Sequence, residues 1–161
     1  MTELAFAIFG FLLGLVPPWL SRKQRLKTHW CALRAEMTLC KEKAETLLSD
    51  NVMSPLYRLP VIAYQVSFPV LLSDGAIAEE EVLTLGKFFE QVQDINRGLD
   101  NAAQAKMSND SHNLKTEYDR NILKAGSLVK EHKGKSSLFS LAKEIVDRKI
   151  SLRWCRYDKY A

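Results

Sequence analysis

The sequence has few of the residue patterns that enzymes and metalloproteins use. Its three cysteines, Cys31, Cys40 and Cys155, form no Cys-x-x-Cys or Cys/His ligand spacing, and its three histidines lie far apart. No spacing brings two acids or an acid and a histidine together as a catalytic pair. We therefore expect no metal, no cofactor and no catalytic site. The side chains most open to a catalytic role are Asp74, Glu79, Glu90, Asp94, His112 and Asp119.

Strand patterns are also missing. No stretch alternates apolar and polar residues as a half-buried strand does, and no internal repeat or low-complexity tract is present. Apolar residues instead recur every three or four positions, which is typical of helices. The sequence therefore predicts an all-α fold: an N-terminal single transmembrane helix, a long juxtamembrane helix and a small helical bundle.

The most prominent feature is an uncharged apolar run, residues 4–20, followed at once by four cations. A helix of roughly 17 residues spans about 25 Å, close to the thickness of a thin bilayer. Cations on the C-terminal side alone predict an N-terminus outside the cell and a cytoplasmic C-terminal domain. The predicted membrane-contact residues are Leu4, Phe6, Ile8, Phe9, Phe11, Leu12, Leu13, Leu15, Trp19, Arg22, Lys23, Arg25 and Lys27.

Two other interpretations of the run remain open. A cleaved secretory signal would carry a basic n-region and a small-residue cleavage site, whereas this chain begins Met1-Thr2-Glu3. A buried core helix is the second, although the run is apolar on every face. Pro17 and Pro18 lack N–H groups, so we expect the helix to kink or end there.

Gly10 and Gly14 form a small-xxx-small pair within the run. Two glycines four residues apart allow another helix to approach closely. They are therefore candidate self-association residues, and a homo-oligomer is one predicted partner state. The plain alternative is that glycine is simply common in membrane helices.

The charge distribution divides the chain into three parts. The net charge is +3 over residues 1–27, −4 over residues 28–129 and +5 over residues 130–161. Basic ends suit contact with an anionic lipid bilayer, whereas a nucleic-acid partner would favour one basic face over the whole domain. We expect a membrane anchor at 1–21, a juxtamembrane helix at 22–49, and a helical domain at 50–161 that packs with it.

The juxtamembrane helix carries an unbroken heptad seam. Its apolar positions are Leu26, Trp30, Leu33, Met37, Cys40, Ala44 and Leu47. Trp, Met, Cys and Ala are poor choices for a two-stranded coiled coil, so packing within the domain is favoured over a parallel stalk.

Further helices are predicted at about 60–68, 78–105, 112–131 and from Ser136 or Ser137 onward, with Pro69 breaking or kinking the first of them. Residues 61–72 contain no charge and are expected to be the most buried part of the domain. A second membrane span there is too short and too broken. Gly98 interrupts the longest helix, where it permits a close helix crossing.

The C-terminal tail, residues 150–161, mixes Leu152, Trp154, Tyr157 and Tyr160 with Arg153, Arg156 and Lys159. This mixture suits a lipid headgroup region, base stacking, or docking on the domain with the cations left in water. Docking is favoured.

Three function classes follow. The first is a membrane-anchored adaptor that recruits or regulates an unidentified protein partner. The second is an oligomerising membrane effector that perturbs the bilayer, and the third is an enzyme. The absence of a catalytic constellation favours the adaptor.

Overall fold

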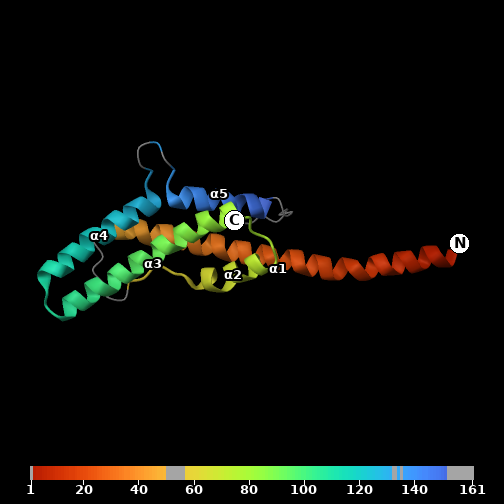
Figure 1. The fold of residues 1–161 in the computed structure, drawn as a ribbon, viewed down its shortest axis with the longest axis horizontal. Helices are drawn as coiled ribbons and strands as arrows, with labels where there is room; N and C mark the ends of the chain where they lie inside the picture. The colour runs from red at the N-terminus through yellow and green to blue at the C-terminus, as the bar shows by residue number, and fades with distance from the viewer. Residues whose placement is uncertain (1, 50–56, 132–133, 135, 152–161) are drawn as a thin grey trace.

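The fold is entirely helical. The structure, a computed structural model, describes residues 2–49, 57–131, 134 and 136–151, with side chains from residue 18 onward. Its helices are α1 (Thr2–Ser49), α2 (Ile62–Ser73), α3 (Glu79–Met107), α4 (Ser111–Val129) and α5 (Leu138–Ser151) (Figure 1). No strand occurs in these ranges, which confirms the predicted all-α class.

Helix α1 is one continuous element of 48 residues. At 1.5 Å per residue it is about 72 Å long, and its N-terminal part projects beyond the bundle (Figure 1). The helix does not end at Pro17 and Pro18, because residues on both sides of the pair keep a helical backbone. The anchor and the juxtamembrane segment are thus parts of the same helix.

The predicted single-pass location is corrected as well. Over the part of the chain that the structure describes, no helix combines the length and the apolar character that a bilayer crossing requires. The predicted transmembrane anchor, and with it the orientation of the two ends, is therefore wrong. The physical reasons are that a run of about 17 residues falls short of a hydrocarbon core about 30 Å thick, and that the helix continues directly into charged residues.

The core is built on the heptad seam of α1. All seven seam residues from Leu26 to Leu47 are buried, with at most 5% of any of them exposed. They belong to one continuous core with the buried stripe of α3, which consists of Leu85, Phe88, Phe89, Val92, Ile95 and Leu99. The seam therefore packs within the bundle in this structure.

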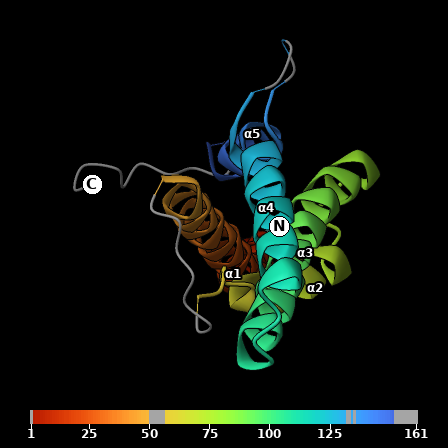
Figure 2. The same cartoon turned by 90° about the vertical axis from the view of Figure 1, so that its left-hand side faces the viewer.

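Helices α2, α4 and α5 each contact α1 directly. Helices α3 and α4 form a hairpin, while α2 and α5 lie at opposite edges of the bundle (Figures 1 and 2). Helix α2 runs antiparallel to α1, because its first turn contacts Glu36 and its C-cap residue Asp74 contacts Arg25. It continues through Pro69 without ending.

The close crossing predicted at Gly98 lies between α3 and α4. A β-carbon on Gly98 would collide with the carboxamide of Asn121, which is completely buried. Neither Asn121 Oδ1 nor Nδ2 has a hydrogen-bond partner among the residues that the structure describes. Glycine is therefore required here by space rather than by backbone conformation.

Candidate functional site

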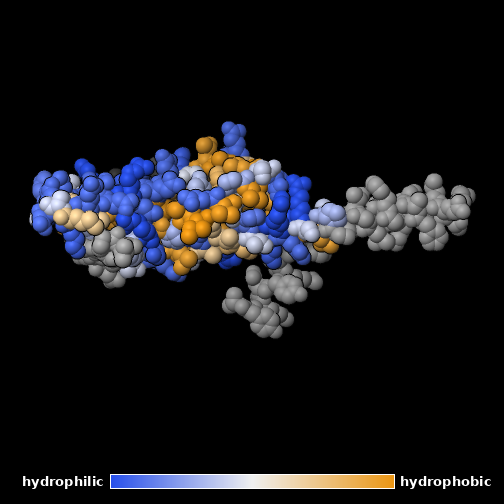
Figure 3. Space-filling view, turned by 90° about the horizontal axis from the view of Figure 1, so that it is seen from below, coloured by the Kyte–Doolittle hydropathy of each residue, from blue (hydrophilic) through white to orange (hydrophobic). Residues whose placement is uncertain are grey.

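The most unusual surface of the bundle is the outward side of α2. Ile62, Val66, Pro69 and Leu72 lie at helical spacings of 4, 3 and 3 and are all exposed, and we call these four residues the α2 face. Ile62 is 73% exposed and Val66 is 60% exposed. Figure 3 shows a broad hydrophobic area on this side of the molecule. The expectation that residues 61–72 are the most buried part of the domain is therefore wrong.

Helix α2 is held firmly despite this exposure. Its first turn is capped by Glu36 of α1, whose carboxylate accepts from the backbone N–H of Ala63 at 2.5 Å and of Tyr64 at 2.8 Å. Glu36 is only 5% exposed. A buried carboxylate at a helix N-terminus satisfies N–H groups that lack helical partners and favours the positive end of the helix dipole. This cap fixes α2 to α1.

Aromatic stacking holds the inner side of α2. The ring of Tyr64 stacks on Phe89 of α3, with centroids 4.1 Å apart, and lies 4.8 Å from the ring of Phe68. Burial raises the pKa of Tyr64, and the nearby charge of Glu90 adds to this effect. Almost one turn beyond Tyr64, Ser67 Oγ lies 3.0 Å from His29 Nδ1 of α1. The inner side thus takes part in the core while the α2 face remains outside it.

The segment before α2 is fixed just as closely. Asn96 of α3 accepts from the N–H of Leu59 at 2.8 Å and donates to its carbonyl at 2.9 Å. The Cys40 thiol donates to the Pro60 carbonyl at 3.2 Å. Burial and the charge of Glu36 raise the pKa of Cys40 to about 12, so this thiol stays protonated and serves packing rather than chemistry.

The C-terminal end of α2 meets the cations of α1, which we call the basic cluster: Arg22, Lys23, Arg25 and Lys27. Asp74 accepts from Arg25 at 2.7 Å, and its carbonyl accepts from Arg22 at 3.1 Å. The bond from Arg25 is the main cause that lowers the pKa of Asp74. Lys23 lies 3.5 Å from the centroid of the exposed Trp19 ring. Exposed ion pairs such as these set the local charge but stabilise the fold little.

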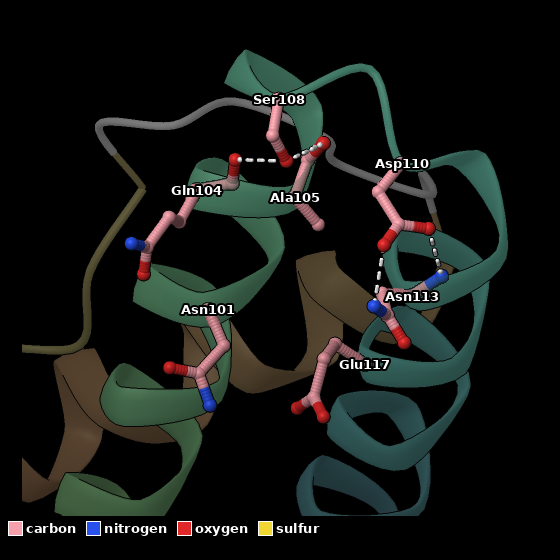
Figure 4. Close-up of a pocket in the computed structure, with 7 residues that line it drawn as sticks. All are labelled: Asn101, Gln104, Ala105, Ser108, Asp110, Asn113 and Glu117. Carbon is pink, nitrogen blue, oxygen red and sulfur yellow. Dashed lines mark hydrogen bonds between the residues drawn. The ribbon is translucent and has the colours of Figure 1, made fainter.

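Two hollows on the bundle are weaker candidates. The first lies between α3 and α4 and has a volume of about 360 Å³ (Figure 4). Its lining residues are Asn101, Gln104, Ala105, Ser108, Asp110, Asn113 and Glu117.

Most of these polar groups are already occupied. Asp110 caps α4 by accepting from the N–H of Asn113, a bond that lowers its pKa, and Ser108 donates to main-chain carbonyls of α3. Glu117 is paired with Arg120. Within the described ranges no group of three or more His, Cys, Asp or Glu side chains is arranged to hold a metal.

The second hollow is apolar and has a volume of about 600 Å³. It lies between the end of α1, α4 and the start of α5. Leu48, Ile122, Leu123 and Leu138 supply its apolar lining, and Lys130 and Glu131 are charged residues of its lining. Leu123, one of its lining residues, is 74% exposed.

The predicted site residues fall into two groups. Trp19 and the basic cluster are exposed or half-exposed at the base of the bundle, next to the end of α2. The other membrane-contact candidates and both self-association candidates lie outside the residues whose side chains are described, and they are Leu4, Phe6, Ile8, Phe9, Gly10, Phe11, Leu12, Leu13, Gly14 and Leu15.

The acids and the histidine considered for catalysis are dispersed. Asp74 is paired with Arg25, and Asp94 with Arg97. Glu90 lies near Tyr64, whereas His112 is exposed in the first turn of α4. Among the described residues, no hydrogen bond or ion pair joins any of these six side chains to another.

Sequence reasoning missed two buried carboxylates. They are Glu36 and Glu81, which are only 5% and 7% exposed. Glu81 in fact accepts from the N–H of Ala78 at 2.8 Å and pairs with Arg148 and Lys149 of α5 at 2.9 and 2.7 Å. The only local signal is the position of Glu81 three residues after the N-cap Ala78, because the cations are 67 or more residues away.

Comparison with known proteins gives no further guidance: no family model, no curated protein and no solved structure matches this chain.

Proposed function

We propose that this protein is a helical interaction module that binds a protein partner through the α2 face. The observation that carries the proposal is an uncharged apolar helix face that is exposed although its helix is capped and stacked firmly on the bundle. Soluble surfaces rarely keep such a patch without a binding role. A prearranged helix also loses little conformational entropy when a partner binds.

The shape of the face favours a helical partner segment. Ile62, Val66 and Pro69 stand at i, i+4 and i+7, the spacing at which one amphipathic helix presents its side chains to another. The face is a single row of exposed side chains along one helix, so another helix suits it better than a small molecule does. We therefore propose a partner helix whose contact side is apolar and uncharged.

The size of the face sets the strength of binding. Covering what is exposed of Ile62, Val66 and Leu72 contributes about 1–2 kcal/mol each, since complete burial of such a side chain is worth about 1.5–3 kcal/mol. The sum of about 3–6 kcal/mol lies below the roughly 8 kcal/mol that a micromolar complex requires. We therefore expect transient binding unless contacts from α1 or α3 add to it.

A non-catalytic role is part of this proposal. It is supported by the dispersal of the candidate acids and by the occupied polar groups of the α3–α4 hollow. A partner would be recruited or regulated by contact alone.

The test compares baits that differ only at the surface. Proteins captured by the wild-type chain would be quantified against those captured by Val66→Asp, and each protein lost would be purified and measured for direct binding. We expect the charge on the α2 face to weaken one partner at least tenfold, because a carboxylate buried without a counterion is strongly unfavourable.

Leu123→Asp is the matched control, since Leu123 is equally exposed but belongs to the apolar hollow of α4. Both variants should keep the wild-type far-UV circular dichroism spectrum, because substitutions at exposed positions change stability little. If Leu123→Asp loses the partner and Val66→Asp keeps it, the hollow is the docking site and the proposal is wrong.

A further inference from the structure

The end of α5 is fixed beside the end of α2. Arg148 and Lys149, in the last turn of α5, pair with Glu81, and Lys149 Nζ donates to the Ala76 carbonyl at 3.2 Å. Ala76 follows the C-terminal end of α2 by three residues. The chain beyond Ser151 therefore starts near the C-terminal end of α2, on the side of the bundle opposite the α2 face.

The residues that follow have the length and the chemistry to cover this face. The α2 face runs from Ile62 to Leu72, about 15 Å along the helix axis. Residues 152–161, which lie outside the described residues, can reach about 33 Å when extended. Their sequence carries Leu152, Trp154, Tyr157 and Tyr160, and large amphipathic rings are well suited to an exposed apolar face.

The charge of residues 152–161 is opposite to the charge of the surface on the α3 side of α2. The segment contains Arg153, Arg156, Asp158 and Lys159, a net charge of +2. On the α3 side of α2, the exposed carboxylates of Glu79, Glu80 and Glu90 have no ion pair among the described residues, against one exposed lysine, Lys87. The basic cluster lies on the α1 side, where Asp74 already engages two of its members. A basic segment is thus attracted along the α3 side.

We infer that residues 152–161 dock on the α2 face of their own chain, with the aromatic rings on Val66 and Leu72 and the cations toward α3. The docked segment occupies the surface that the protein partner uses, so the two compete. The competition rests on the proposed function, whereas the docking does not.

Disulfide trapping tests the docking directly. The segment carries its own thiol, Cys155, and Gln65→Cys places a second one on the exposed side of α2. Cys31, which is exposed, would be changed to Ser, while Cys40 is buried and its pKa of about 12 keeps it unreactive. Leu123→Cys in the same background is the control for random collision. Mild oxidation, non-reducing gels and mass spectrometry then measure the bridge.

We expect an intramolecular bridge at least fivefold more abundant with Gln65→Cys than with Leu123→Cys. Equal yields would show that the segment has no preferred place and would overturn the docking. A bridge that forms only between two molecules would make a second copy the occupant and would equally overturn it.

Competition has a separate readout. Trp154→Ser with Tyr157→Ser should increase affinity for the partner by about tenfold if the segment covers the face about nine-tenths of the time. A bridge with unchanged partner affinity would leave the docking standing and overturn the competition. Loss of partner binding in Val66→Asp, without a bridge, would leave the proposed function standing and remove this inference.

Discussion

At the crossing of α3 and α4, we expect the effect of Gly98→Ala on the free energy of unfolding to change sign with the side chain at Asn121. In an ordinary helix interior, Gly→Ala stabilises by about 1 kcal/mol, because alanine restricts the unfolded backbone. Here the new methyl group would overlap the Asn121 carboxamide. Asn121 has no exposed surface and cannot swing into water. Overpacking costs about 1–3 kcal/mol, and overlap with a completely buried carboxamide places this site at the upper end, about 3 kcal/mol. Set against the gain of about 1 kcal/mol, we expect Gly98→Ala to destabilise the protein by about 2 kcal/mol net.

Removing the carboxamide should reverse the effect. Asn121→Ala empties the space that the Gly98→Ala methyl group needs, and it removes two buried polar atoms that have no partner. Relief of that desolvation, about 1–3 kcal/mol, offsets the lost packing, so we expect Asn121→Ala alone to be nearly neutral. In this background Gly98→Ala should stabilise by up to about 1 kcal/mol, a coupling of about 3 kcal/mol between the two sites.

Urea denaturation followed by circular dichroism at 222 nm measures all four proteins of the cycle. For a chain of this size, 2 kcal/mol corresponds to about 4–8 °C in the melting temperature. Gly86→Ala, also in α3 but with open space around its α-carbon, is the control and should be neutral or stabilising. The reasoning is refuted if Gly98→Ala destabilises equally with and without the Asn121 side chain.

Three further substitutions concern the buried polar contacts. Glu36→Gln should lower the free energy of unfolding by about 1–2 kcal/mol, because an amide can accept only one of the two α2 N–H groups through its oxygen. Asn96→Ala should cost about 1–3 kcal/mol by leaving the N–H and carbonyl of Leu59 without partners. The pKa of Glu81 lies below its ordinary 4.5, because the bonds from Ala78, Lys149 and Arg148 outweigh the effect of burial. Its stabilisation is therefore present above about pH 4.5 and is lost as the pH falls further, and Glu81→Gln should flatten the stability profile in that range.

Each of these has a matched control. Glu42→Gln changes an exposed acid of α1, and Asn101→Ala an exposed amide of α3, and both should stay within about 0.5 kcal/mol of wild type. Equal losses in Glu36→Gln and Glu42→Gln would rule out the cap as the cause. An unchanged acid profile in Glu81→Gln would show that other carboxylates control acid unfolding.

Periodicity predicted those parts of the fold that depend on local spacing. The seam from Leu26 to Leu47 was read correctly as a buried stripe because helical neighbours recur at fixed offsets. The close crossing at Gly98 was also anticipated, since a mid-helix glycine usually has a packing reason. Its partner Asn121 was not, because nothing near it in the sequence identifies a residue on the facing helix.

The α2 face was misread for a different reason. A run without charges indicates that a segment is apolar, but it does not show how many sides of that segment other helices cover. Helix α2 packs on one side only, with Tyr64 and Phe68 inside and Ile62 and Val66 outside. The N-terminal run was misread for the same reason, because the apolar composition of a segment does not show what surrounds it in the fold. Glu36 was missed because its contacts lie 27 and 28 residues away.

Because α1 is continuous, its first and last turns keep a fixed angle to each other around the helix axis. A helix turns by about 100° per residue, so an unbroken rod from Thr2 to Ser49 relates the azimuth of its first turns to that of its last. Helix α2 is held against α1 by contacts with Glu36 and Arg25. The direction in which the α2 face points is therefore set by whatever orients the N-terminal turns of α1. Inserting two residues between Trp19 and Arg22 would turn that side through about 200° while moving it only about 3 Å along the axis. A change in the length of α1 therefore alters the direction of the α2 face much more than its position along the helix axis.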